Sequence, residues 1–191
     1  MSIPLFKVGM SPDVSEKLRP VLESGFIGQG PQVEEFEQEL STALGFVSPA
    51  LLSMNSCTSA LDMALHLAGI GPGDLVLSTP QTCLASNSVI HNRGATIAWL
   101  DINPLTGNVS ADDLRNCLKL YPEAKAAMLV DWAGRISVTA DIASIAKDHR
   151  QVQTKEPLIL IEDAAHAFDA YDIEGLPASF YADYCAWSFQ A

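Results

Sequence analysis

The chain has 191 residues, which is enough for one domain with a sizeable core. Hydrophobic residues make up 48% and charged residues 18%, a balance that excludes an intrinsically disordered chain. The formal net charge of −12 disfavours general nucleic-acid binding, because an acidic surface repels phosphate backbones.

Residues 1–30 differ in composition from the rest of the chain. They are rich in Pro and Gly and contain one predicted helix, Pro12–Ser24. The remainder shows no internal repeat and no obvious linker. We therefore predict an N-terminal arm (residues 1–30), packed on the domain or on a partner subunit, followed by one domain (residues 31–191).

Residues 31–191 alternate between short apolar runs and segments with helical periodicity. The runs lack polar alternation, as expected for parallel strands that are covered on both faces. They are Leu51–Met54, Leu75–Ser78, Ala95–Leu100, Ala126–Val130, Leu158–Ile161 and Tyr184–Trp187. The predicted helices are Pro31–Leu44, Thr58–Ala68, Ser110–Leu120 and Thr139–His149, the third with Ser110 as its N-cap. This order predicts βαβ units, hence an α/β fold with a mainly parallel sheet.

Ligands of open parallel sheets bind at the carboxyl ends of the strands, which directs attention to the residues after each run. Asn55–Ser59 follows the first run and opens a helix, whose free N–H groups suit an anion such as phosphate. Simple N-capping by Ser56 or Thr58 is the alternative, and it is the better interpretation of this segment alone. The sequence contains neither a P-loop lysine motif nor a G-x-G-x-x-G turn after a strand, which argues against a plain ATP- or NAD-binding domain.

The segment Glu162–His166 is more specific. A carboxylate at the end of a fully apolar strand is costly unless it pairs with a cation or a protonated ring nitrogen. We predict that Glu162 caps the following turn and that His166 lies at the same edge, whereas a binding function for Asp163 is the preferred interpretation only together with the other segments described below. Asp131, after Ala126–Val130, either contacts a substrate or caps a turn.

Targeting and metal signals are absent from the sequence. No apolar run is long enough for a bilayer span, no basic amphipathic helix suggests a membrane surface, and Met1–Lys7 has no secretory pattern. Cys57, Cys83, Cys117 and Cys185 form no C-x-x-C pair, so we predict no metal site and free thiols in a reducing cytoplasm.

Several segments together resemble, in chain order, the signatures of the DegT/DnrJ/EryC1/StrS sugar aminotransferases. They are Phe26–Glu37, Ser56–Leu61 (S-C-T-S-A-L), Asp101-Ile102 with Thr106–Asn108, Ile161–Ala167 (I-E-D-A-A-H-A), and Asp183 with Ser188-Phe189. The resemblance covers nearly the whole chain. It implies a three-layer α/β/α sandwich similar to the large domain of fold-type-I enzymes that use pyridoxal 5′-phosphate (PLP), present here in part.

The resemblance also implies an activity and partners. The family commonly moves an amino group from glutamate to a keto group of a nucleotide-linked sugar, at a site on a homodimer interface. By resemblance, Asp163 pairs with the cofactor's pyridinium nitrogen and His166 contacts the ring oxygen. The cofactor phosphate would be held by Cys57, Thr58 and Ser188.

Three further positions carry weaker implications of the same resemblance. Cys83 stands where an aromatic side chain usually stacks on the cofactor ring, and a thiol stacks poorly. Gly28 and Gly30 would lie near the substrate.

The family's Schiff-base lysine follows the serine of the S-F pair by five positions, which is position 193 and lies beyond Ala191. We therefore expect no catalytic residue among residues 1–191 and no transamination by this chain alone. Two alternatives stay open: a relative that is a sugar dehydratase, with histidine at position 193, and a non-catalytic remnant that persists as a folded dimer or binds a partner protein.

Overall fold

The computed structural model of the chain describes residues 9–46, 51–149 and 156–190. The chain divides between Met54 and Asn55 into two compact units, the second of which ends at Phe189. The first unit contains α1 (Val14–Ser24) and α2 (Pro31–Ala43), so both helices predicted there are confirmed. The predicted domain, residues 31–191, includes α2, but in the structure α2 lies in the first unit together with α1. How the arm packs stays a prediction.

The second unit alternates strands and helices. In chain order its elements are α3 (Cys57–Leu67), β1 (Leu75–Ser78), α4 (Leu84–Asn92), β2 (Thr96–Trp99), α5 (Ala111–Leu120), β3 (Ala126–Val130), the short 3₁₀ turn η1 (Trp132–Gly134), α6 (Ala140–His149), β4 (Ile159–Ala164) and β5 (Tyr184–Trp187). The helix α4 was not predicted, because its sequence has only a weak apolar stripe. Across the described residues, no helix combines the length and the apolar surface that a membrane span requires.

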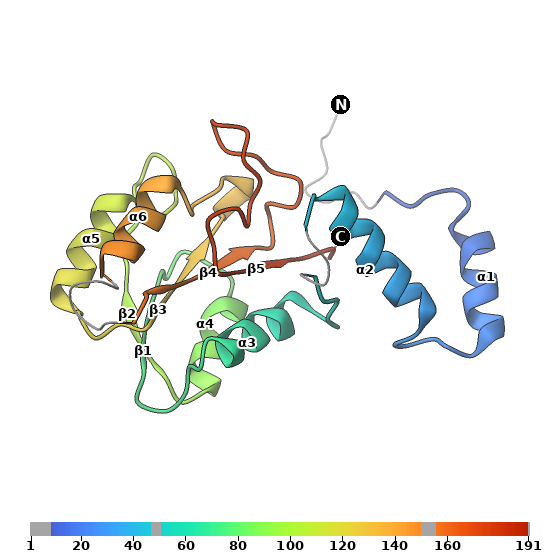
Figure 1. Cartoon of the computed structure of the whole chain (residues 1–191), viewed down its shortest axis with the longest axis horizontal. Helices are drawn as coiled ribbons and strands as arrows, with labels where there is room; N and C mark the ends of the chain where they lie inside the picture. Colours follow the sequence, from blue (N-terminus) through green and yellow to red (C-terminus); the bar gives the residue numbers. More distant parts are fainter. Residues whose placement is uncertain (1–8, 47–50, 150–155, 191) are drawn as a thin grey trace. The chain divides into compact units, whose positions relative to one another are not determined.

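The five strands form one parallel sheet in the order β2-β1-β3-β4-β5. The α/β class and the parallel sheet predicted from the sequence are therefore confirmed. Because all strands run the same way, their carboxyl ends meet at one edge of the sheet (Figure 1).

The predicted strand Leu51–Met54 is wrong, since residues 51–54 have no regular structure. The backbone N–H and the Oγ of Ser53 instead donate to Oε1 of Glu37 in the same unit, at 2.7 and 2.6 Å. A backbone donor that is engaged by a carboxylate is not available for a strand ladder.

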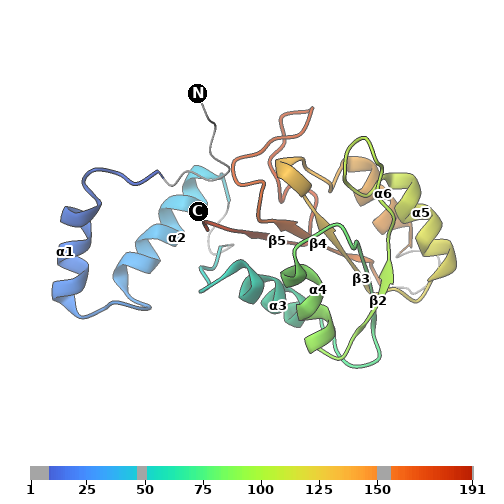
Figure 2. The same cartoon turned by 180° about the vertical axis from the view of Figure 1, so that it is seen from behind.

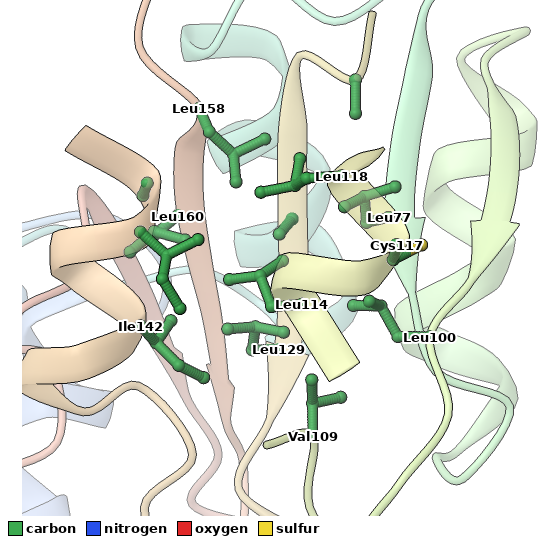
Figure 3. Close-up of a cluster of buried hydrophobic side chains, with 14 of the residues drawn as sticks. Leu77, Leu100, Val109, Leu114, Cys117, Leu118, Leu129, Ile142, Leu158 and Leu160 are labelled. Atoms are coloured by element: carbon green, nitrogen blue, oxygen red, sulfur yellow. The ribbon is translucent and has the colours of Figure 1, made fainter. Parts of the chain in front are cut away.

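Two helical layers cover the sheet, as Figures 1 and 2 show from opposite sides. Val76 and Met128 face the cluster that includes Leu61 and Leu65 of α3. The neighbouring residues of the strands face the other way, into a cluster with α5 and α6 (Figure 3). The labelled members of this second cluster are Leu77, Leu100, Val109, Leu114, Cys117, Leu118, Leu129, Ile142, Leu158 and Leu160. This alternation explains why the strands read as continuous apolar runs.

The cap predicted at Ser110 is confirmed. Its Oγ accepts from the backbone N–H of Asp113 at 3.2 Å, and the Asp113 carboxylate accepts from the backbone N–H of Ser110 at 3.1 Å. This reciprocal capping box satisfies two donors that an isolated helix end leaves unpaired.

The connection from β4 to β5, residues 165–183, contains turns and one isolated bridge between Tyr171 and Pro177, in place of a crossover helix. It returns the chain from the carboxyl end of β4 to the amino end of β5, as parallel pairing requires. There Oδ2 of Asp183 accepts from the backbone N–H of Leu160 at 2.8 Å and joins the end of the connection to β4.

Candidate functional site

Polar residues gather at the carboxyl edge of the sheet. Asp131 directly follows β3, Asp163 is the penultimate residue of β4, and Ser188 directly follows β5. The register places Asp163 opposite both Val130 and Ala186. The structure thus brings together three of the residues that the sequence analysis assigned to one edge.

Asp163 is buried, with 5% of its surface exposed. Its Oδ2 accepts a hydrogen bond of 2.5 Å from the hydroxyl of Ser86, and its Oδ1 accepts from the backbone N–H of Ala165 at 3.2 Å. None of the ion pairs recorded for the described residues includes this carboxylate. Asp163 is therefore held in place by neutral donors and has no cationic partner in this part of the chain.

Ser86 lies on α4 and is fully buried. Its hydroxyl is also 2.6 Å from the Thr82 hydroxyl, so two hydroxyls in series lead to Asp163. The next residue, Asn87, accepts from the Ser78 hydroxyl at 2.7 Å and donates to the Thr79 carbonyl at 3.0 Å. These bonds tie α4 to the end of β1 and thereby fix the position of Ser86.

Cys57 is the first residue of α3 and lies beside Asp163. Its Sγ is 4.0 Å from Oδ1 of Asp163 and 3.8 Å from the Ala186 carbonyl oxygen. Burial, with smaller contributions from Asp163 and Cys83, raises the pKa of the Cys57 thiol to about 12. The thiol stays protonated near neutral pH and is a poor nucleophile.

The N-terminus of α3 is capped as the simpler interpretation predicts. The Oγ of Ser56 accepts from the backbone N–H of Ser59 at 3.1 Å. Thr58 is exposed in the first turn. The amides of Cys57 and Thr58, the first two of the helix, have no carbonyl within the helix to bond, so they are available to an anion.

His166 is exposed just after β4, and its ring lies 5.6 Å from that of Trp132 at a tilt of 58°. The turn that carries Trp132 comes close to the His166 backbone. A Cβ on Gly134, whose φ is +78°, would lie 2.9 Å from the His166 carbonyl oxygen. Glycine is therefore required where these two segments meet.

The prediction that Glu162 caps the following turn is wrong. Glu162 is fully buried, and its Oε2 accepts from the backbone N–H of Ser179, 17 residues away, at 2.6 Å. Asp131 is also fully buried, and its Oδ1 accepts from the backbone N–H and the hydroxyl of Ser137, at 2.7 and 2.8 Å. This pair of bonds corresponds to the turn-capping role predicted for Asp131, whereas its contact with a substrate stays a prediction.

Burial raises the pKa of both acids. The desolvation of Glu162, together with the neighbouring Asp131, raises the pKa of Glu162 to about 9. Desolvation likewise raises the pKa of Asp131, and the hydrogen bonds from Ser137 oppose that rise. A buried carboxyl without a cation keeps its proton more strongly than an exposed one.

The remaining predicted residues lie at element ends. Cys83 is exposed and precedes the first residue of α4, and Ser188 is half-buried after β5. Gly30 precedes α2 with an extended backbone, and Gly28 lies two residues earlier. Both glycines belong to the first unit.

Within residues 9–46, 51–149 and 156–190, no group of three or more His, Cys, Asp and Glu side chains converges in a way that could hold a metal ion. The four cysteines are free thiols. Lys125 directly precedes β3 and forms an ion pair with Asp74. It therefore lies at the amino edge of the sheet, whereas Asp163 lies at the carboxyl edge.

Sequence reasoning missed Ser86 and Thr82, which complete the surroundings of Asp163. Both follow the apolar run that became β1, at the edge where ligands bind, and this position was the available signal. The sequence of Leu84–Asn92 has only a weak apolar stripe, so it did not predict the helix α4, on which Ser86 lies within hydrogen-bond distance of Asp163.

A sequence model of the DegT/DnrJ/EryC1/StrS aminotransferase family matches residues 10–191. The dTDP-4-dehydro-2,3,6-trideoxy-D-glucose 4-aminotransferase of Saccharopolyspora spinosa is 30% identical over 176 residues, which are 92% of this chain and 43% of that protein. The chain thus spans less than half the length of this curated relative.

Solved structures match the fold over the same extent. The sugar aminotransferase CalS13 of Micromonospora echinospora is 34% identical, with a TM-score of 0.88, over 100% of this chain and 50% of that one. Spr1654 of Streptococcus pneumoniae, solved in its PLP form, is 28% identical, with a TM-score of 0.87, over 100% of this chain and 50% of that one. The present chain corresponds to about half of each.

Proposed function

Because this chain belongs to the DegT/DnrJ/EryC1/StrS aminotransferase family and is a partial-length relative of its PLP-dependent sugar aminotransferases, we propose that it supplies the cofactor-holding part of such an enzyme. The substrate class would be nucleotide-linked keto sugars, with glutamate as the amino donor and a homodimer as the working unit. When bound, PLP supplies an electron sink for the carbanion formed at the substrate Cα.

The observation that carries this proposal is the state of Asp163. Its carboxylate is buried, accepts two hydrogen bonds and has no cation in the described part of the chain. An anion at such a position is stabilised by a protonated ring nitrogen brought in by a ligand. Ser86 holds one oxygen and Ala165 orients the other, so the carboxylate is ready to keep that nitrogen protonated.

The phosphate of the cofactor would bind at the start of α3. The amides of Cys57 and Thr58 belong to its first turn, where the helix dipole favours an anion. Cys57 is also within 4.0 Å of Asp163, so a ligand held at both places spans a short distance. Ser188 at the end of β5 would add a hydroxyl to the same phosphate.

His166, with Trp132 beside it, would contact the oxygen of the ring. Cys83 at the start of α4 would lie near the face of the ring, where its small thiol contributes little stacking. Gly28 and Gly30 would border the substrate. The lysine that the chemistry needs would follow Ser188 at position 193, as in the family pattern.

The test is a PLP titration of the purified chain, followed by borohydride reduction and intact-mass analysis. We expect saturable binding and no covalent mass gain. Asp163→Ala should abolish binding, while Asp148→Asn, on the exposed surface of α6, should leave it unchanged. Binding that survives Asp163→Ala, or no binding at all, would contradict the proposal, and a covalent adduct would show that another lysine reaches the ring.

The codons that follow position 191 in the encoding gene distinguish the aminotransferase from a sugar dehydratase and from a non-catalytic remnant. A lysine at position 193 supports the aminotransferase, a histidine supports the dehydratase, and a stop codon supports a folded remnant.

A further inference from the structure

Asp131 and Glu162 project from one face of the sheet at its carboxyl edge. Leu129 and Glu162 are partners in the β3–β4 register, and Asp131 follows Leu129 by two residues, so all three side chains lie on the same face. The backbone N–H of Asp131 donates to the Asp163 carbonyl at 3.0 Å, which continues the ladder past the end of β3. The two carboxyl groups therefore face each other across neighbouring strands.

Each acid has one satisfied oxygen and one oxygen without a donor. Ser137 donates to Oδ1 of Asp131, and Ser179 donates to Oε2 of Glu162. Oδ2 of Asp131 and Oε1 of Glu162 are buried, and neither has a hydrogen-bond partner in the described part of the chain. Two bare carboxylate oxygens in this arrangement would repel each other in a low dielectric.

The groups around the pair do not neutralise it. The Cys185 side chain on β5 faces Glu162 and, as a donor, makes the smallest contribution to the pKa of Glu162, which it lowers; burial raises the pKa of the thiol well above its usual value, so it is uncharged. The Asp163 carboxyl projects from the opposite face of β4, where it accepts from Ser86. None of the described lysine, arginine or histidine side chains forms an ion pair with either acid.

We propose that Asp131 and Glu162 share one proton and form a pH-sensitive latch that holds residues 165–183 against the carboxyl ends of β3 and β4. The proton lies between Oε1 of Glu162 and Oδ2 of Asp131, so one group donates and the other accepts. Loss of the proton to solvent leaves two facing carboxylates, which separate. The latch concerns the folded chain without a ligand and does not rest on the proposed function.

The latch connects two loops to the strand ends. Ser137 donates to Asp131, and Ser179 donates to Glu162. The shared proton between the two acids would therefore connect the loop of Ser137 with the loop of Ser179. The held segment also contains His166, and Asp163 is the next residue after Glu162. Opening of the latch therefore releases the loop side of the candidate site while the Ser86 side stays in place.

Infrared spectroscopy of the wild-type chain detects the shared proton directly as the C=O stretching band of a protonated carboxyl. We expect this band near neutral pH, where exposed carboxyls are ionised, and its loss at alkaline pH. Hydrogen exchange at the Ser179 amide should follow the same titration, with protection that falls by about tenfold per pH unit once the proton is lost. A wild-type spectrum without the band near neutral pH would overturn the proposal, and no variant is needed for this result.

Two variants identify the acids. Glu162→Gln keeps an acceptor for Ser179 and an amide donor for Asp131, so the band should disappear while Ser179 stays protected at alkaline pH. Asp131→Asn takes away the neighbouring carboxylate and offers an amide donor to Glu162, while the burial of Glu162 remains, so the band should be lost at a lower pH than in the wild-type chain. Glu123→Gln, an exposed position after α5, is the matched control and should leave the band unchanged. A band that survives in Glu162→Gln, or that is lost at the same pH in Asp131→Asn as in the wild-type chain, would refute the shared proton.

Discussion

The hydroxyl of Ser86 donates a 2.5 Å hydrogen bond to Oδ2 of Asp163, across 77 residues of sequence. The bond joins α4 to β4, and both groups are buried. A charge-assisted bond of this kind both stabilises an anion and sets its direction. It leaves Oδ1, which is near Cys57 and Ala165, as the oxygen that would face the proposed ring nitrogen.

Replacement of Ser86 by alanine should lower the free energy of unfolding by about 1–3 kcal/mol, because Oδ2 of Asp163 would lose its donor in a buried place. Urea unfolding followed by circular dichroism measures the difference. The same variant should weaken PLP binding, since the carboxylate would no longer be held in one orientation. Ser86→Thr retains the hydroxyl and should recover part of both losses.

Ser88→Ala is the matched control for this experiment. Ser88 lies on the same helix, and its hydroxyl donates to the Ala85 carbonyl of that helix at 3.1 Å, so loss of the hydroxyl should change the free energy of unfolding by less than about 1 kcal/mol. Equal losses for the two alanine variants would show that the bond to Asp163 has no special weight.

The stability of the chain should depend on pH through Glu162. The folded-state pKa of Glu162, about 9, lies above the usual value of 4.5, so the unfolded state releases its proton first as the pH rises. The free energy of unfolding should therefore fall between about pH 5 and pH 9, with a limiting slope of about 1.4 kcal/mol per pH unit for one proton. Urea unfolding at a series of pH values measures this slope, and Glu162→Gln should flatten it. A wild-type stability that rises over this range would contradict the assignment.

Gly134→Ala and Gly175→Ala form a pair that separates backbone strain from steric contact. Both glycines have φ of +78°, so alanine costs about 1–2 kcal/mol at either position. A Cβ on Gly134 would also meet the His166 carbonyl oxygen at 2.9 Å, whereas no atom of the residues that the structure describes would lie within 4 Å of a Cβ on Gly175. We expect Gly134→Ala to be the more destabilising by about 1–3 kcal/mol in urea unfolding. Equal losses would mean that the turn moves away from His166 without cost.

The four cysteines should differ in their rate of alkylation. Cys83 is exposed and should react first with iodoacetamide. Cys57 should react at least about tenfold more slowly near pH 8, because its pKa of about 12 leaves little thiolate. Burial also raises the pKa of the Cys117 and Cys185 thiols, so both should be slow. Peptide mapping by mass spectrometry gives the order, and early modification of Cys57 would contradict its buried, protonated state.

Much of the fold of the second unit could be predicted from the sequence, because burial on both faces imposes a pattern that is visible along the chain. A strand covered by helices on each side must be apolar at every position, and β1 and β3 follow from that requirement. The importance of Asp163 followed for a related reason, since a carboxylate at the end of an apolar strand needs a partner. The family resemblance rested on the same local segments.

Only the tertiary structure decided which side chains meet. Leu51–Met54 has the composition of a strand, but a strand requires a neighbour to bond, and Glu37 takes the backbone donor of Ser53 instead. Ser86 reaches Asp163 because Asn87, which accepts from the Ser78 hydroxyl and donates to the Thr79 carbonyl, fixes α4. Glu162 and Asp131 face each other because β3 and β4 are paired in a particular register. The register depends on how two segments pair, so it cannot be read from the sequence of either segment alone.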